Sequence, residues 1–167
     1  MNRRRGFSLI EVVVSAAIVS VMVVASLNAV GATAKARAMA ADRARGSMLA
    51  HHLLAEILAQ PFVDPQLDTG LIGLDLGEST LINRLSLDDV DDYHGLSETL
   101  PLRRDASPVE GGKGYRRTTR VVHCTDDGRA SITATGIKRI TVSVFRGNVP
   151  LASISALRTR EWDRAKP

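Results

Sequence analysis

The sequence has a single cysteine, Cys124, among its 167 residues. One thiol cannot close a disulfide within the chain, so the core and the hydrogen bonds must hold any compact domain together. Cys124 ends a stretch rich in β-branched residues, which favours a strand. We therefore interpret it as a small buried apolar residue. His123 beside it would need further ligands to form a metal site, and the sequence indicates none.

The sequence also lacks the common catalytic signatures. The glycine-rich segment 111–114 does not have the Gly-x-x-x-x-Gly-Lys-Ser/Thr spacing of a phosphate-binding loop. No serine stands in a Gly-x-Ser-x-Gly setting. The four histidines, at positions 51, 52, 94 and 123, are not spaced as metal ligands. We therefore predict that the chain is not an enzyme and carries no cofactor, with the calcium candidate below as the one open case.

What the sequence does have is a long apolar run over residues 7–30, preceded by Arg3, Arg4 and Arg5. About 20 apolar residues are enough to cross the hydrocarbon core of a bilayer. The run contains one carboxylate, Glu11, and a charged group at the bilayer centre costs about 2.5–3.5 kcal/mol. A chain that retains such a charge usually has a partner for it.

The residues that lead to this carboxylate read Gly6-Phe7-Ser8-Leu9-Ile10-Glu11. This motif resembles the class III leader of type IV prepilins and type II secretion pseudopilins. The resemblance implies that a prepilin peptidase cuts between Gly6 and Phe7 and then N-methylates Phe7. It also implies that Glu11 pairs with the α-amine of a neighbouring subunit during filament assembly. Every position of the motif matches, and the resemblance covers the first quarter of the chain.

Elementary physical chemistry agrees with this resemblance. The positive-inside rule places Arg3, Arg4 and Arg5 in the cytoplasm, so the remainder of the chain is expected beyond the inner membrane. Gly6 has no side chain to obstruct a protease that closes around the backbone. Pairing with an amine would offset the desolvation of the Glu11 carboxylate.

Two other kinds of N terminus stay open. A conventional signal peptide has a basic stub, an apolar segment and a small-residue cleavage site. Residues 28–34 could supply that cleavage site. Cleavage there would release a secreted protein, such as an enzyme. A plain single-pass anchor would carry a binding module, an adhesin or a sensor. Signal peptides have apolar segments of only about 7–15 residues, so the length of this run and its glutamate favour the prepilin interpretation.

The charge balance changes once the leader is removed. The whole chain has 22 basic and 18 acidic residues, and three of the basic ones lie in residues 1–6. The remaining 19 basic and 18 acidic residues leave a net charge of +1. Binding of nucleic acid, which depends on phosphate contacts, is therefore not expected. We interpret the arginine groups as solvated faces; they are Arg103 with Arg104, and Arg116 and Arg117 with Arg120.

The helical pattern continues beyond the apolar run. One apolar face recurs at steps of seven, three, four and four residues, as a helix requires; its members are Met39, Gly46, Leu49, Leu53 and Ile57. Pro61 is a natural stop. The sequence predicts one helix over residues 7–60, apolar and membrane-spanning over 7–30 and amphipathic over 31–60.

The rest of the chain, residues 61–167, is expected to form a globular head with a loop-rich region and an antiparallel sheet. Apolar and polar residues alternate in four runs, which predict strands over 115–124, 130–135, 137–145 and 151–157; shorter strands are expected over 71–76 and 80–82. The predicted fold class is α+β, a pilin-like α-roll in which a long N-terminal helix packs on a C-terminal antiparallel β-sheet.

An acidic segment stands out within the loop-rich region, with four carboxylates in five residues: Asp88, Asp89, Asp91 and Asp92. Such a cluster could coordinate Ca²⁺, although its spacing is not that of an EF-hand. The alternative is an acidic turn or a helix cap. Residues 88–95 are also similar to a short motif in minor pilins of the mannose-sensitive haemagglutinin pilus type, the D subunit in particular.

These features predict a minor pilin or pseudopilin, a structural subunit of a type IV pilus or a related filament. Its expected partners are prepilin peptidase, the inner membrane and other pilin or pseudopilin subunits, which it would contact through the N-terminal helix. A minor pseudopilin of a type II secretion system is the alternative within the same class.

Overall fold

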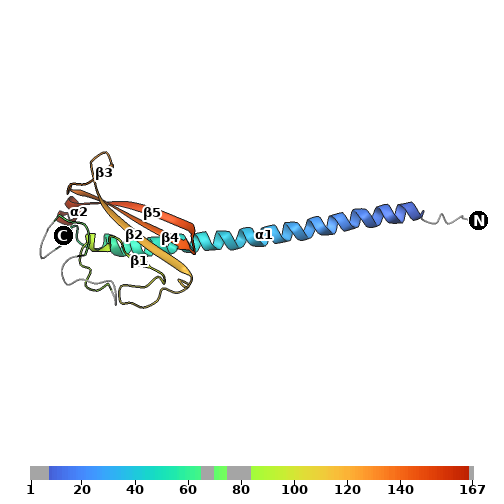
Figure 1. Ribbon diagram of the computed structural model, residues 1–167, viewed down its shortest axis with the longest axis horizontal. Helices are drawn as coiled ribbons and strands as arrows, with labels where there is room; N and C mark the ends of the chain where they lie inside the picture. The colour runs from blue at the N-terminus through green and yellow to red at the C-terminus, as the bar shows by residue number, and fades with distance from the viewer. Residues whose placement is uncertain (1–7, 65–69, 75–83, 166–167) are drawn as a thin grey trace, which may run out of the picture. The chain divides into compact units, whose positions relative to one another are not determined.

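The computed structural model describes residues 8–64, 70–74 and 84–165. Figure 1 shows a long helix and a sheet; the elements are α1 (Leu9–Leu58), the 3₁₀ helix η1 (Asp91–Tyr93), β1 (Ser97–Glu98), β2 (Tyr115–Cys124), β3 (Ala130–Ser131), β4 (Ile137–Arg146), β5 (Val149–Thr159) and α2 (Arg160–Arg164). The α+β class predicted from the sequence, with the long helix packed on a C-terminal antiparallel sheet, is confirmed. The chain forms two compact units, Met1–Ala41 and Asp42–Pro167.

Helix α1 begins after Ser8, whose carbonyl accepts the backbone N–H groups of Glu11 and Val12 at 3.0 and 3.2 Å. Serine is a favoured residue at this capping position. The helix ends at Leu58, close to the end predicted from Pro61. The last turn tightens, because the N–H of Gln60 bonds to the carbonyl of Ile57 at 3.1 Å.

The sheet has the strand order β1-β2-β4-β5, and β3 pairs with the end of β2. All neighbouring strands are antiparallel. Strand β2 has the predicted bounds, and β4 and β5 extend one to two residues beyond theirs. The strand predicted over 130–135 is shorter, because β3 ends at Ser131. Residues 71–74 form no strand, and the strand expected over 80–82 lies outside the described residues.

The core of the second unit lies between α1 and one face of the sheet. Helix α1 buries one face, Gly46, Leu49, Ala50, Leu53, Leu54 and Ile57. The sheet meets it with Val121, Ile140, Val142 and Val144, all fully buried. Each such apolar side chain contributes about 1.5–3 kcal/mol when it leaves water. Met39, predicted on the same helical face, is instead 49 % exposed and lies in the first unit.

Gly46 allows the helix to approach the sheet closely. A Cβ atom at this position would lie only 2.9 Å from the Cβ of Leu151, closer than such atoms approach in proteins. The absence of a side chain at Gly46 therefore sets the distance between α1 and the start of β5.

Candidate functional site

The predicted processing site lies outside the described residues, since these begin at Ser8; this applies to Arg3, Arg4, Arg5, Gly6 and Phe7. The predicted assembly residue, Glu11, lies in the first turn of α1 and is exposed. A carboxylate in the first turn is favourable for the helix, because the unpaired N–H groups carry partial positive charge there.

The surface of α1 that follows Glu11 is apolar and exposed, with Ile18, Val21 and Leu27 all more than half accessible. Over the described residues, α1 is the one helix long and apolar enough to cross a membrane. A signal sequence meets the same criterion.

Three hydroxyl groups in the apolar part of this helix are partnered within it. Ser20, Ser26 and Thr33 each bond to the carbonyl four residues earlier, at 2.7 to 2.8 Å. Such internal bonds allow a polar side chain to lie in an apolar environment. Glu11 differs: it is the only charged residue from position 8 to 34, and no residue that the structure describes donates a hydrogen bond to its carboxylate.

The acidic segment in the head forms reciprocal backbone caps. The Oδ1 atom of Asp89 accepts the N–H groups of Asp91 and Asp92, at 2.6 and 3.1 Å. The Oδ2 atom of Asp92 accepts those of Asp88 and Asp89, at 2.9 and 3.0 Å. These bonds hold the backbone of the turn that leads into η1.

A third carboxylate of the segment is used in the core. Asp91 Oδ2 accepts a hydrogen bond from the Nζ atom of Lys138 at 2.6 Å, and both side chains are buried. Burial, together with the negative charge of Asp91, raises the pKa of Asp89 from 3.8 to about 6. The segment therefore carries a carboxyl group that takes up a proton in mildly acidic solution.

The structure places the four calcium candidates in one turn, but their oxygen atoms point largely to backbone N–H groups and to Lys138. Among the described residues, no group of three or more His, Cys, Asp or Glu side chains is arranged to hold a metal ion. Calcium binding by Asp88, Asp89, Asp91 and Asp92 stays a prediction without structural support.

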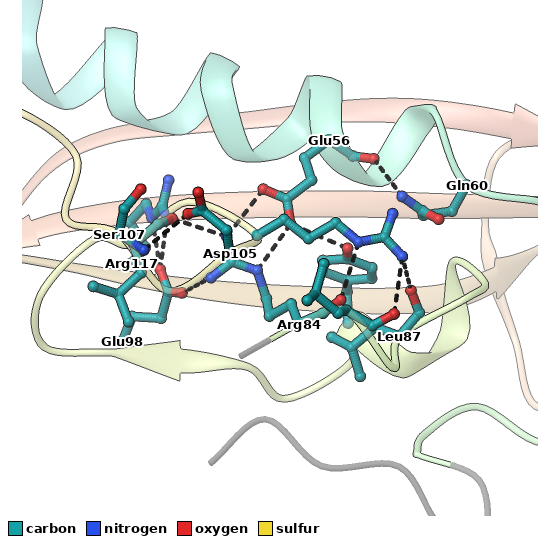
Figure 2. A network of polar contacts seen from close by, with 12 residues as sticks. Glu56, Gln60, Arg84, Leu87, Glu98, Asp105, Ser107 and Arg117 are labelled. Carbon is teal, nitrogen blue, oxygen red and sulfur yellow. Dashed lines mark hydrogen bonds and ion pairs between the residues drawn. The ribbon is translucent and has the colours of Figure 1, made fainter. Parts of the chain in front are cut away.

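Figure 2 shows a second polar network beneath α1. Arg84 pairs with Glu56 of α1 through two bonds of 2.8 and 2.9 Å, and also contacts Glu98 of β1. Arg117 of β2 donates to Glu98 and to the carbonyl of Leu102. The hydroxyl of Tyr93 donates to Glu56 at 3.1 Å. The network ties the helix, the loop region and two strands together.

This network corrects the prediction that Arg116, Arg117 and Arg120 form a solvated face. Arg120 is exposed, but Arg117 is fully buried. The strand alternation supplies the signal that was missed: positions 115, 117, 119 and 121 of β2 all point to the core. Lys138 lies on the inward face of β4 for the same reason. Arg84 has no comparable signal, because no regular element contains it.

Comparison with known proteins gives one match. Residues 1–27 match the family model described as the prokaryotic N-terminal methylation motif. The matched segment is the class III leader, the signal of prepilins and pseudopilins, and it lies within the first quarter of the chain. No characterised protein and no solved structure matches the chain.

Proposed function

Because the chain carries the N-terminal methylation motif, we propose that it is a minor pilin or pseudopilin that assembles into a type IV pilus or a related filament. Prepilin peptidase cuts the chain between Gly6 and Phe7 and methylates the new α-amine. The head then lies outside the cytoplasm while α1 is held in the inner membrane. The leader is common to pili and to type II secretion filaments, so the proposal includes both.

The observation that carries this proposal is the isolated charge of Glu11. Ser20, Ser26 and Thr33 find acceptors within α1, whereas Glu11 finds no donor among the described residues. The α-amine of a processed neighbouring chain is a cation at the same depth in the membrane. Pairing of the two offsets the cost of desolvating both charges, so Glu11 acts in docking and in the axial register of the subunit.

The first experiment determines the N-terminal sequence and intact mass of the membrane-extracted chain, with and without active prepilin peptidase. The proposal expects a chain that begins at methylated Phe7 only when the peptidase is active. A start near residues 32–34 would instead indicate a signal peptide and a secreted product. An intact Met1 under both conditions would indicate a plain anchor.

The second experiment compares Glu11→Ala with Ser15→Ala, a neighbouring substitution on the same exposed apolar helix. Removal of the carboxylate is expected to abolish incorporation into filaments, while Ser15→Ala leaves incorporation unchanged. If the helix is a plain anchor, Glu11→Ala should instead favour membrane insertion, because removal of a charge from a membrane span stabilises the inserted state by about 2.5–3.5 kcal/mol. Normal incorporation of Glu11→Ala would refute the docking role.

A further inference from the structure

Strand β5 borders the sheet and leaves one edge open. It is the last strand in the order β1-β2-β4-β5. It is 11 residues long, and its residues from Val149 to Leu157 carry no charge. Natural edge strands are commonly short or carry lysines that prevent another strand from pairing. The devices of this kind in β5 lie at its beginning: Pro150, and a register shift between β4 and β5 beside it, where Leu151 has no partner in β4.

The register of the sheet shows which backbone groups face outward. The N–H of Arg160 bonds to the carbonyl of Gly136, which continues the pairing of β5 with β4. Antiparallel pairs alternate, so every second residue of β5 points its N–H and C=O groups away from β4. These outward residues are Ser153, Ser155 and Leu157.

The side-chain distances agree with this assignment. Side chains lie closest in pairs that do not exchange backbone bonds. The hydroxyls of Thr141 and Ser155 are 2.8 Å apart, and those of Ser143 and Ser153 are 3.0 Å apart. Within the described part of the chain, no group bonds to the outward N–H or C=O groups of Ser153, Ser155 or Leu157.

An apolar pocket lies at the C-terminal end of the same edge. Its volume is about 350 Å³, and Leu58, Leu157, Arg158, Thr159 and Trp162 line it. Leu58 comes from α1 on the covered face of the sheet, whereas Leu157 points to the opposite face. A pocket that both residues line must therefore lie at the margin of β5. Leu157 and Trp162 are 58 % and 61 % exposed, and the guanidinium of Arg158 lies 5.8 Å from the Trp162 ring centroid.

We propose that the outer edge of β5 binds an extended, uncharged segment of a different filament subunit, which adds a strand to the sheet and places one apolar side chain in the pocket. Main-chain bonds give such a contact its affinity, and the pocket gives it specificity. The inference rests on the proposed function, because a filament brings heads side by side.

A second copy of this chain does not fit that role. Two β5 edges would pair through the same surface on both copies, and such a contact closes a dimer. A filament needs head-to-tail contacts. The opposite edge of the sheet offers only the two residues of β1, and Glu98 there is already held by Arg117. Pairing of β5 with either sheet edge of a second copy therefore does not extend a filament, and we assign the added strand to a different subunit.

The experiment introduces a photo-crosslinking benzophenone amino acid at Ser153 of the full chain, in cells that assemble the filament. The same amino acid at Arg120, exposed on β2 away from the edge, is the control for position. Ser155→Pro removes one outward N–H and keeps the backbone bonds to β4, since proline is tolerated on such an edge. Ser155→Ala loses the same hydroxyl contact with Thr141 but keeps that N–H, so the pair isolates the N–H.

The proposal expects an adduct, identified by mass spectrometry, between position 153 and a second chain with a class III leader. Ser155→Pro should reduce its yield about tenfold, since one lost hydrogen bond and the ring clash exceed 1.4 kcal/mol, and Ser155→Ala should leave it unchanged. Adducts only with another copy of this chain, no adduct, or an equal yield with Ser155→Pro would each overturn the proposal.

A thermal unfolding curve of each variant shows that the head still folds. If Ser155→Pro does not fold, Ser155→Lys replaces it, because a lysine on an edge opposes strand addition. Processing at Gly6 and filament incorporation are measured in the same cells. A chain that is processed and incorporated without the adduct refutes only the β5 contact, whereas an unprocessed chain refutes the proposed function.

Discussion

Arg117 and Glu98 form an ion pair that is sealed within the head. The Nε and Nη2 atoms of Arg117 donate to Oε2 of Glu98 at 2.9 and 2.6 Å. The side chain of Arg117 has no exposed surface, and that of Glu98 is 8 % exposed. Arg84 holds the other oxygen of Glu98, so the carboxylate lies between two guanidinium groups.

Arg117→Ala is expected to destabilise the head strongly. The substitution leaves Glu98 with one cation fewer and opens a cavity under α1, and loss of one partner from a buried pair costs about 3–5 kcal/mol. The measurement is urea unfolding of the full chain in detergent micelles. Arg120→Ala on the same strand is the control and should change stability by about 0.5 kcal/mol or less. Equal effects of the two substitutions would contradict the buried pair.

Gly46 and Gly31 of α1 should respond in opposite directions to alanine. A Cβ atom at Gly46 meets Leu151, whereas one at Gly31 meets nothing within 4 Å. Gly46→Ala therefore forces α1 away from β5, and such overpacking costs about 1–3 kcal/mol. Gly31→Ala should favour the helix by up to about 1 kcal/mol.

Unfolding of the head measures the first change, and helix content by circular dichroism measures the second. A head that gains stability with Gly46→Ala would show that the close approach at Leu151 is not required.

The protonated carboxyl group of Asp89 should contribute to the stability of the head at about pH 4, and this contribution should be lost as the pH rises to about 6. Its pKa is raised in the folded state from 3.8 to about 6, first by burial and then by Asp91. The folded state thus binds the proton more tightly than the unfolded state does, and this contribution is lost as the pH rises through the folded pKa.

Asp89→Asn tests this, because an amide oxygen can still accept the N–H groups of Asp91 and Asp92 but does not titrate. The free energy of unfolding of the wild type minus that of the variant should fall between pH 4 and pH 7. Carboxyl groups with lowered pKa values, such as Asp42, lose their contribution to stability at low pH. Their contributions are the same in both proteins and cancel in this difference. A difference independent of pH would refute the assignment.

Sequence patterns predicted the parts of this protein that depend on neighbouring residues. The leader is one contiguous motif, and the alternation along residues 115–124 and 137–145 identified β2 and β4. The side of the sheet on which Arg117 lies could have been found in the same way, but the adjacent basic residues suggested a solvated face.

The pairing of Glu56, Arg84 and Glu98 could not be predicted, because the partners are 14 and 28 residues apart and come from a helix, a loop and a short strand. Nothing local specifies such an encounter. The open edge of β5 likewise became evident only when the strand order was known, since a run of alternating residues is the same in a central strand and at an edge.

Asp163 of α2 holds the exit of α1 against the end of the sheet. Its Oδ2 atom accepts the N–H of Phe62 at 2.5 Å, and its Oδ1 atom pairs with Arg158, which is 2 % exposed. Asp163→Ala leaves that guanidinium without its carboxylate and the N–H of Phe62 without its acceptor. Hydrogen bonds to charged groups contribute about 1.5–3 kcal/mol, so we expect a loss of that size in urea unfolding.

Glu161→Ala is the matched control on the same helix. Among the residues that the structure describes, the carboxylate of Glu161 pairs with Arg164 alone, and both side chains are largely exposed, so its loss should cost about 0.5 kcal/mol or less. Because Arg158 and Trp162 also line the pocket beside β5, Asp163→Ala should in addition weaken the crosslink at position 153, while Glu161→Ala should not. If both substitutions have the same small effect on unfolding, α2 does not anchor the end of α1, and the pocket does not depend on Asp163.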